Sequence, residues 1–187
     1  MNVVSNPFRA AMAAIAALSA LALLAASGWQ AIGDAQPCPW CTLQRLVFWA
    51  TLVVSAVAFV ATGARRRNEP SRGAALRVGI AGSIAAIALT GIAAAGYQSF
   101  LLVDTGSCAL TFADRVMDAT GLPQAWPFMF AATGPCGDAN VPVAGIPMSV
   151  WSLALFVAVF AAAVAAAAAA LRGREPAPGP QRVAQAR

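Results

Sequence analysis

The sequence predicts an all-α membrane protein, a bundle of four transmembrane helices with a short interfacial helix in its second outer loop. Of the 187 residues, 60% are hydrophobic and 10% are charged, and the mean hydropathy is +0.71. Too few polar side chains remain to cover the surface of a soluble domain. The chain also contains several long apolar runs, and its arginines gather between them. These observations together exclude an ordinary soluble protein.

Four apolar runs predict the membrane-spanning helices. A helix needs about 20 apolar residues to cross a hydrocarbon layer about 30 Å thick. Each run is expected to be helical, because a backbone in lipid must satisfy its own hydrogen bonds. The expected spans are about 10–32, 43–63, 78–102 and 146–171. Glycines in the third run favour close helix contacts; they are Gly79, Gly82, Gly91 and Gly96.

The remaining segments divide into loops and a tail. We expect one membrane domain over residues 1–171, with outer loops at about 33–42 and 103–145. Residues 172–187 are rich in Pro, Gly and Arg, which predicts a disordered cytoplasmic tail. The first run has an alternative interpretation as a cleaved signal peptide, although it is long for the apolar part of such a peptide. Either interpretation leaves the cysteines on the outer side.

The arginines predict the orientation in the membrane. All twelve basic residues are arginines, and ten of them fall on one side of the expected spans. Arginine-rich connections stay in the cytoplasm, so we expect both termini there and all four cysteines outside. Basic runs that flank spans set topology, and no nucleic-acid partner is expected.

The longer outer loop contains an amphipathic pattern. Apolar Phe112, Val116 and Met117 alternate with charged Asp114 and Asp118. This pattern predicts a short helix lying on the membrane surface. Trp126 and Phe128 would then anchor it at the level of the lipid headgroups. A loop whose apolar residues pack on the bundle remains an alternative.

The cysteines form two unlike pairs. Cys38 and Cys41 have C-x-x-C spacing just before the second span, whereas Cys108 and Cys136 are widely spaced in the longer loop. Two structural disulfides would suit an oxidising compartment. By loop-closure entropy, the 29-residue loop between Cys108 and Cys136 gains about 3.5 kcal/mol, but the four-residue ring gains only about 2 kcal/mol.

A C-x-x-C pair is therefore a poor staple and typical of a dithiol that opens and closes. A Cys₄ zinc site is disfavoured, because the second pair lacks the short spacing of such sites, and no metal is expected. Attachment of c-type haem is excluded, because Thr42 occupies the position that histidine requires.

Arg45 follows Cys41 by about one helical turn, so both should face the same way. A guanidinium there would stabilise a thiolate. Snorkelling of Arg45 to the headgroups is the alternative. Beside a C-x-x-C pair we favour the functional role.

Three segments carry a resemblance to a known family. The segments "PCPWCTLQR", "WPFMFAATGPC" and "GIPMSVW" resemble the signature segments of the disulfide bond formation protein B (DsbB) family, bacterial inner-membrane thiol:quinone oxidoreductases. The resemblance covers the whole membrane part of the chain. It implies an enzyme that reoxidises a soluble periplasmic oxidase of the DsbA type and passes the electrons to ubiquinone or menaquinone in the membrane pool.

The resemblance also implies roles for individual residues. Cys108 would be attacked by the partner's thiolate, which frees Cys136, and Cys136 would then engage Cys38. Cys41 would be left as a thiolate against the quinone, and Arg45 would hold that thiolate and polarise a quinone oxygen.

Further residues are expected near the quinone on grounds of depth, namely Gln44, Tyr97 and Gln98. The family often carries a polar or histidine residue near the outer end of the third span, and this chain has no histidine.

Two other functions remain open. A disulfide-stapled four-helix scaffold without catalysis would keep its cysteine pairs in the large loop, whereas Cys38 and Cys41 lie in the small one. A relative of the vitamin K epoxide reductases, or a transporter of thiol reductant, is the other. A path for reductant through the membrane would need cysteines within the spans, and there are none.

Overall fold

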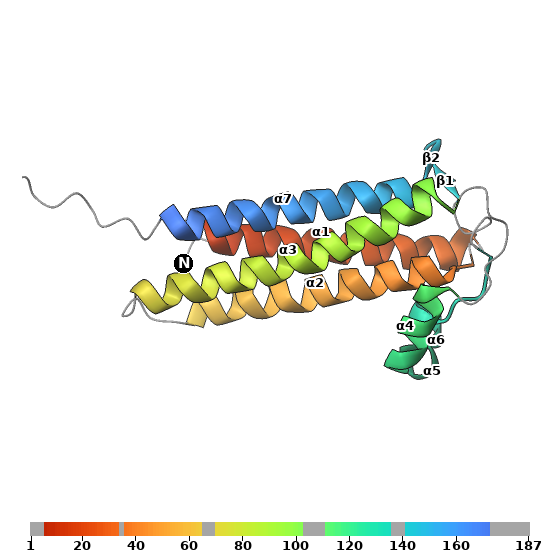
Figure 1. The fold of residues 1–187 in the computed structure, drawn as a ribbon, viewed down its shortest axis with the longest axis horizontal. Coiled ribbons are helices and arrows are strands. Elements are labelled where there is room, and N and C mark those ends of the chain that lie inside the picture. Colours follow the sequence, from red (N-terminus) through yellow and green to blue (C-terminus); the bar gives the residue numbers. More distant parts are fainter. Residues whose placement is uncertain (1–5, 34–35, 65–69, 103–110, 136–140, 173–187) are drawn as a thin grey trace, which may run out of the picture.

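The computed structural model is an all-helical bundle with four helices long and apolar enough to cross a membrane (Figure 1). It describes residues 6–33, 36–64, 70–102, 111–135 and 141–172. The predicted four-helix membrane fold is confirmed. The long helices are α1 (Pro7–Gly33), α2 (Pro39–Ala64), α3 (Pro70–Phe100) and α7 (Met148–Arg172).

The four long helices form a ring in which each packs on two neighbours. Helix α1 packs on α2 and α7, and α3 packs on the same two helices. The first residues of α1 and the last residues of α7 lie at one end of the bundle (Figure 1). The short elements between α3 and α7 lie at the opposite end, where α2 begins. We refer to these as the terminal end and the outer end.

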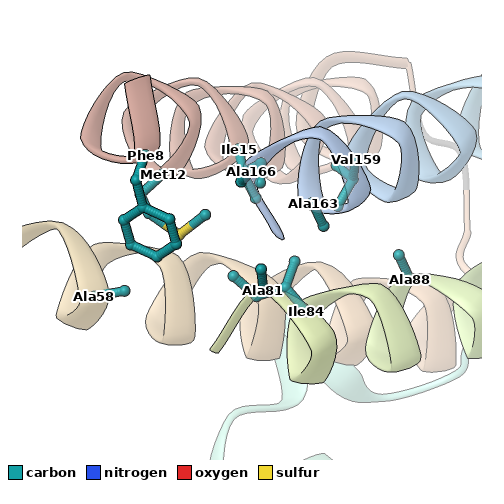
Figure 2. Close-up of a cluster of buried hydrophobic side chains, with 10 residues drawn as sticks. All are labelled: Phe8, Met12, Ile15, Ala58, Ala81, Ile84, Ala88, Val159, Ala163 and Ala166. Atoms are coloured by element: carbon teal, nitrogen blue, oxygen red, sulfur yellow. The ribbon is translucent and has the colours of Figure 1, made fainter. Parts of the chain in front are cut away.

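The terminal end has a core of buried apolar side chains. All four long helices contribute to this cluster, which Figure 2 shows: Phe8, Met12, Ile15, Ala58, Ala81, Ile84, Ala88, Val159, Ala163 and Ala166. Alanine at half of these positions lets the helices approach closely, the usual solution where lipid removes the hydrophobic drive for helix association.

Of the four glycines expected to favour close helix contacts, Gly91 lies at such a contact. A Cβ at Gly91 would overlap the ring of Phe156 on α7, whereas Gly79, Gly82 and Gly96 have open space at that position. The Phe156 ring in turn stacks on Phe48 of α2, with centroids 4.0 Å apart. Gly91 therefore admits the aromatic pair that separates the terminal core from the outer end.

The outer end carries three short helices and a hairpin. The helices are α4 (Phe112–Thr120), α5 (Leu122–Ala125) and α6 (Pro127–Phe130), and the hairpin strands are β1 (Pro142–Val143) and β2 (Ile146–Pro147). Thr111 and Asp114 form a reciprocal capping box at the start of α4. Gly121 ends α4 with a φ of 68°, a left-handed conformation that suits glycine.

The amphipathic helix expected in the longer loop is present as α4. Its Met117 is buried together with Met129 and Phe130 of α6, in a cluster that includes residues of α1, α2 and α3. Phe112, Trp126 and Phe128 are exposed. The segment thus packs on the bundle with one face and presents apolar side chains with another. Its place on the membrane surface stays a proposal.

Several predictions fall on residues that the structure does not describe. Cys108 and Cys136 lie outside the described residues, as does the expected tail apart from its first residue. Their pairing stays a prediction.

Candidate functional site

The C-x-x-C pair occupies the first turn of α2. Pro39 is the first residue of the helix, a favoured place for proline because the first N–H groups have no intrahelical partner. Cys38 is thus the cap, and its sulfur accepts the backbone N–H of Cys41 at 3.4 Å. The two Sγ atoms lie 3.1 Å apart, with Cys38 donating to Cys41. The helix start therefore holds both sulfurs together, where its N–H groups and dipole favour negative charge.

One buried amide, Gln98, contacts both sulfurs, and a second, Gln44, is bonded to it. The Nε2 of Gln98 on α3 lies 3.3 Å from the Cys41 sulfur and 3.5 Å from the Cys38 sulfur. Its Oε1 accepts a 2.6 Å hydrogen bond from Nε2 of Gln44. Gln44 and Gln98 are 4% and 3% exposed. Because Gln44 occupies the oxygen of Gln98, the N–H groups of Gln98 are directed at the thiols.

Arg45 lies one turn after Cys41 and is buried, with 6% of its surface exposed. Its Nη1 donates to Oε1 of Gln30 at 2.6 Å and to the Met129 carbonyl oxygen at 3.2 Å. Its Nη2 donates to the Ala26 carbonyl oxygen at 3.3 Å. A guanidinium bonded to three protein oxygens is not snorkelling to the headgroups. It is held at the outer end as a fixed positive charge.

A cavity of about 110 Å³ lies between these groups and the neighbouring helices. Its polar lining includes Cys41, Gln44, Arg45 and Gln98. Helices α1 and α7 contribute mainly apolar side chains, among them Trp29, Trp151 and Leu155. A concave, mostly apolar cavity with a few convergent polar groups is the usual form of a small-molecule site.

The end of the longer loop is bonded to the segment before Cys38. The backbone N–H groups of Thr133 and Gly134 donate to the Pro37 carbonyl oxygen at 2.9 and 3.2 Å. The Thr133 hydroxyl lies 2.5 Å from Oε1 of Gln36. A Cβ at Gly134 would lie 2.6 Å from the Gln36 Cβ, so a side chain would not fit there. We call this contact the latch, made by Gln36, Pro37, Thr133 and Gly134.

The structure brings most of the predicted site residues together. Cys41, Arg45, Gln44 and Gln98 all line the cavity, and Cys38 contacts Cys41. Tyr97 is not among the lining residues; its ring lies against Trp40, with centroids 4.7 Å apart, and is 42% exposed.

Sequence reasoning missed three parts of the site. These are Gln30, the latch, and the lining from the start of α7, which includes Met148, Ser149 and Trp151. The sequence does indicate Gln30, because a polar residue near the end of an apolar span usually has a polar partner. The indication for the start of α7 is weaker: its first residues belong to the segment "GIPMSVW", one of the three that resemble the family.

Comparisons with known proteins agree on one family. The sequence model described as "Disulfide bond formation protein DsbB" matches residues 8–166. The chain is 26% identical to disulfide bond formation protein B of Nitrosospira multiformis, over 84% of this chain and 89% of the relative. It is 28% identical to the protein of the same name from Nitrosomonas eutropha, over 69% and 75%. Disulfide bond formation protein B 2 of Burkholderia lata is 32% identical, over 75% and 77%.

Proposed function

Because the chain belongs to the DsbB family, we propose that it is a multi-pass inner-membrane thiol:quinone oxidoreductase that sustains disulfide bond formation. In this proposal it reoxidises a soluble periplasmic oxidase of the DsbA type and passes the electrons to ubiquinone or menaquinone. The observation that carries the proposal is the cavity in which the Cys41 sulfur, the Arg45 guanidinium and the Gln98 amide converge.

The cavity suits a quinone headgroup. A cavity of about 150 Å³ can hold one benzene ring, and the volume here, about 110 Å³, is of that order. The aromatic rings of Trp29 and Trp151 suit a flat conjugated ring, and Arg45 and Gln98 carry N–H donors for a carbonyl oxygen. A quinone held there supplies an acceptor for two electrons and two protons.

The residues of this chain would pass oxidising equivalents by thiol exchange. The partner's thiolate attacks Cys108 of a Cys108–Cys136 disulfide, forms a mixed disulfide and releases Cys136 as a thiolate. Cys136 then attacks Cys38 of a Cys38–Cys41 disulfide and releases Cys41 as a thiolate in the cavity. The partner's second thiol closes its own disulfide and frees Cys108.

Cys108 then attacks Cys136 of the Cys136–Cys38 disulfide, which re-forms Cys108–Cys136 and frees Cys38. Oxidation of Cys38 and Cys41 to their disulfide would send two electrons and two protons to the quinone. The net reaction converts one dithiol and one quinone into one disulfide and one quinol. The start of α2 and the Gln98 amide support Cys41 as a leaving thiolate, because N–H donors stabilise negative charge on sulfur.

The latch supports exchange between the two pairs. Sulfurs must touch for a disulfide to move. Gly134 lies two positions before Cys136 in the sequence, and its backbone is bonded to Pro37, the residue before Cys38. The described part of the longer loop therefore already contacts the loop that bears the C-x-x-C pair.

The arrangement of the bundle supports the proposed topology. Helix α1 begins and α7 ends at the terminal end, opposite the start of α2 (Figure 1), where the sequence places Cys38 and Cys41. With the arginine bias of the sequence, this favours cytoplasmic termini and a periplasmic thiol site. The exposed Phe112, Trp126 and Phe128 favour contact of the outer segment with lipid headgroups.

The test separates partner exchange from electron delivery. The purified protein is mixed with a reduced DsbA-type oxidase and a short-chain ubiquinone or menaquinone analogue, and quinol and partner thiols are both measured. We expect one quinol for every two partner thiols lost. Cys108→Ala should block partner reoxidation yet retain quinone reduction by a small dithiol. Equal loss of both activities in that variant would refute the division of labour.

A further inference from the structure

Gln30 joins three elements of the outer end through one amide. Its Oε1 accepts the 2.6 Å hydrogen bond from Arg45 of α2. Its Nε2 donates to the Phe128 carbonyl oxygen of α6 at 3.2 Å. The side chain itself comes from α1, close to its end at Gly33. Both ends of the amide are thus used, one on the charged group and one on the longer loop.

Arg45 is oriented by this arrangement. A guanidinium has five N–H donors. Within the described residues, three of them donate to protein oxygens: those of Gln30, Ala26 and Met129. Two donors remain for a ligand in the cavity that Arg45 lines. The direction of those two donors follows from the three protein bonds, and therefore from α1 and α6.

We propose that Gln30 is a positioning residue that fixes Arg45 toward the cavity and couples that cavity to α6. This inference rests on the proposed function, since it concerns the same cavity. Gln30 holds the guanidinium through its oxygen while its N–H group holds the backbone of α6. The Met129 carbonyl shares the same guanidinium, so a ligand oxygen on Arg45 and the docking of α6 affect each other. By linkage, each changes the affinity of the other by the same factor.

An amide is the group that this position requires. A carboxylate of the same length accepts from Arg45 but has no proton for the Phe128 carbonyl. An aliphatic side chain of similar size makes neither bond. Gln30→Glu and Gln30→Leu therefore divide the two contacts: the first keeps the bond to Arg45 as an ion pair, and the second removes both.

The alternative is that Gln30 only tethers α1 to α6, in which case its loss changes the docking of α6 but not the KM for quinone. Ser27 provides a matched control for this alternative. The Ser27 hydroxyl lies 3.9 Å from the Met129 sulfur, so it also joins α1 to α6. Among the described residues, the hydrogen-bond partners of Arg45 are Gln30, Met129 and Ala26, and Ser27 is not one of them. Ser27→Ala should therefore loosen α6 slightly without changing the use of quinone.

The experiment uses the full chain in one detergent, with a short-chain ubiquinone and a small dithiol. KM and kcat for the quinone are measured, together with hydrogen exchange of the Phe130 and Ala131 amides, which bond to carbonyls of Trp126 and Pro127. For Gln30→Leu we expect a KM about tenfold higher, as for a lost charge-assisted hydrogen bond, with kcat nearly unchanged and faster exchange. Gln30→Glu should speed exchange equally but raise KM by less than about threefold.

The outcomes that contradict the inference are distinct from failure of the proposed function. If wild type reduces the quinone and Gln30→Leu matches its KM and its exchange, the inference on Gln30 is wrong and the proposed function stands. If Gln30→Leu and Ser27→Ala both speed exchange and neither changes KM, Gln30 is only a tether. A wild type that cannot reduce the quinone refutes the proposed function. Should Gln30→Leu fail to insert, Gln30→Ala, which also removes both bonds, takes its place: a higher KM with faster exchange supports the inference, and an unchanged KM refutes it.

Discussion

The two ends of the bundle differ in what they bury. The terminal end buries apolar groups such as Ile84 and Met12, and alanines keep its helices close. The outer end buries Gln44, Gln98 and Arg45 beside two sulfurs and leaves a cavity among them. Burying a polar or charged group costs free energy that only hydrogen bonds to that group offset. The same four helices therefore pack closely at the terminal end and leave a partly polar cavity at the outer end.

The largest effect should follow from replacing the Cys41 sulfur that lines the cavity. Cys41→Ser keeps the size of the side chain but replaces the nucleophile, so quinone reduction should fall by a factor of roughly 1,000 or more. A quinol assay with a small dithiol measures it. Cys108→Ala, which removes a thiol outside the C-x-x-C pair, should keep this activity. Substantial turnover in Cys41→Ser would place the chemistry elsewhere.

Arg45 provides the next test of the outer end. Arg45→Met keeps the apolar stem but removes the donors, and turnover should fall by about 100-fold, the usual scale for one electrostatic stabiliser. Arg45→Lys should recover part of that loss, because it keeps the charge but not the planar fork. Arg115→Met changes an exposed arginine of α4 and serves as the control. Turnover near that of wild type in both Arg45 variants would show that Arg45 has only a structural role.

A substitution at the terminal end should have the opposite signature. Ile84 is fully buried, and Ile84→Ala should lower the free energy of unfolding by about 2 kcal/mol or more. The control is Leu89→Ala on the same helix, where the side chain is half exposed. Thermal unfolding in detergent measures both. At a temperature where Ile84→Ala stays folded, its quinone reduction should match that of wild type. A loss of activity there would contradict the distinction between the two ends.

The smallest effect concerns the latch. Thr133→Val removes the hydroxyl contact with Gln36 but leaves the backbone bonds, so reoxidation of the partner should slow only a few-fold, in line with one neutral hydrogen bond of about 1 kcal/mol. Quinone reduction by a small dithiol should be unaffected. Thr120→Val is the control, because it loses only hydrogen bonds with Met117 and Leu122, neither of which belongs to the latch. An equal slowing of both reactions would argue against a role in exchange.

The sequence predicts the helices because lipid leaves the backbone few choices, but hydropathy does not mark their ends. Helix α3 begins at Pro70, well before the apolar run at about 78, since a helix can extend past the lipid. Helix α1 likewise begins at Pro7, before the apolar run at about 10. It includes Arg9, whose guanidinium lies 4.5 Å from the centre of the Phe59 ring. Apolar runs therefore measure contact with lipid and not the length of a helix.

The site was predictable only where its residues are neighbours in sequence. C-x-x-C spacing and the turn from Cys41 to Arg45 are local, so one helix fixes both. Gln98 reaches the sulfurs because α3 is rotated so that this side chain faces them, while the ring of neighbouring Tyr97 lies against Trp40, outside the cavity lining. That rotation depends on packing across the bundle, including the contact at Gly91, and no single segment encodes it.

The most direct test of the central claim isolates the C-x-x-C pair from the longer loop's cysteines. A variant with Cys108→Ala and Cys136→Ala is reduced, freed of reductant and mixed without oxygen with a short-chain ubiquinone. Quinol is measured by absorbance, and the cysteines are examined by mass spectrometry of unreduced peptides. The account predicts one quinol for each protein and one peptide in which Cys38 and Cys41 are joined. Persistence of both thiols beside excess quinone, with no quinol formed, would contradict it.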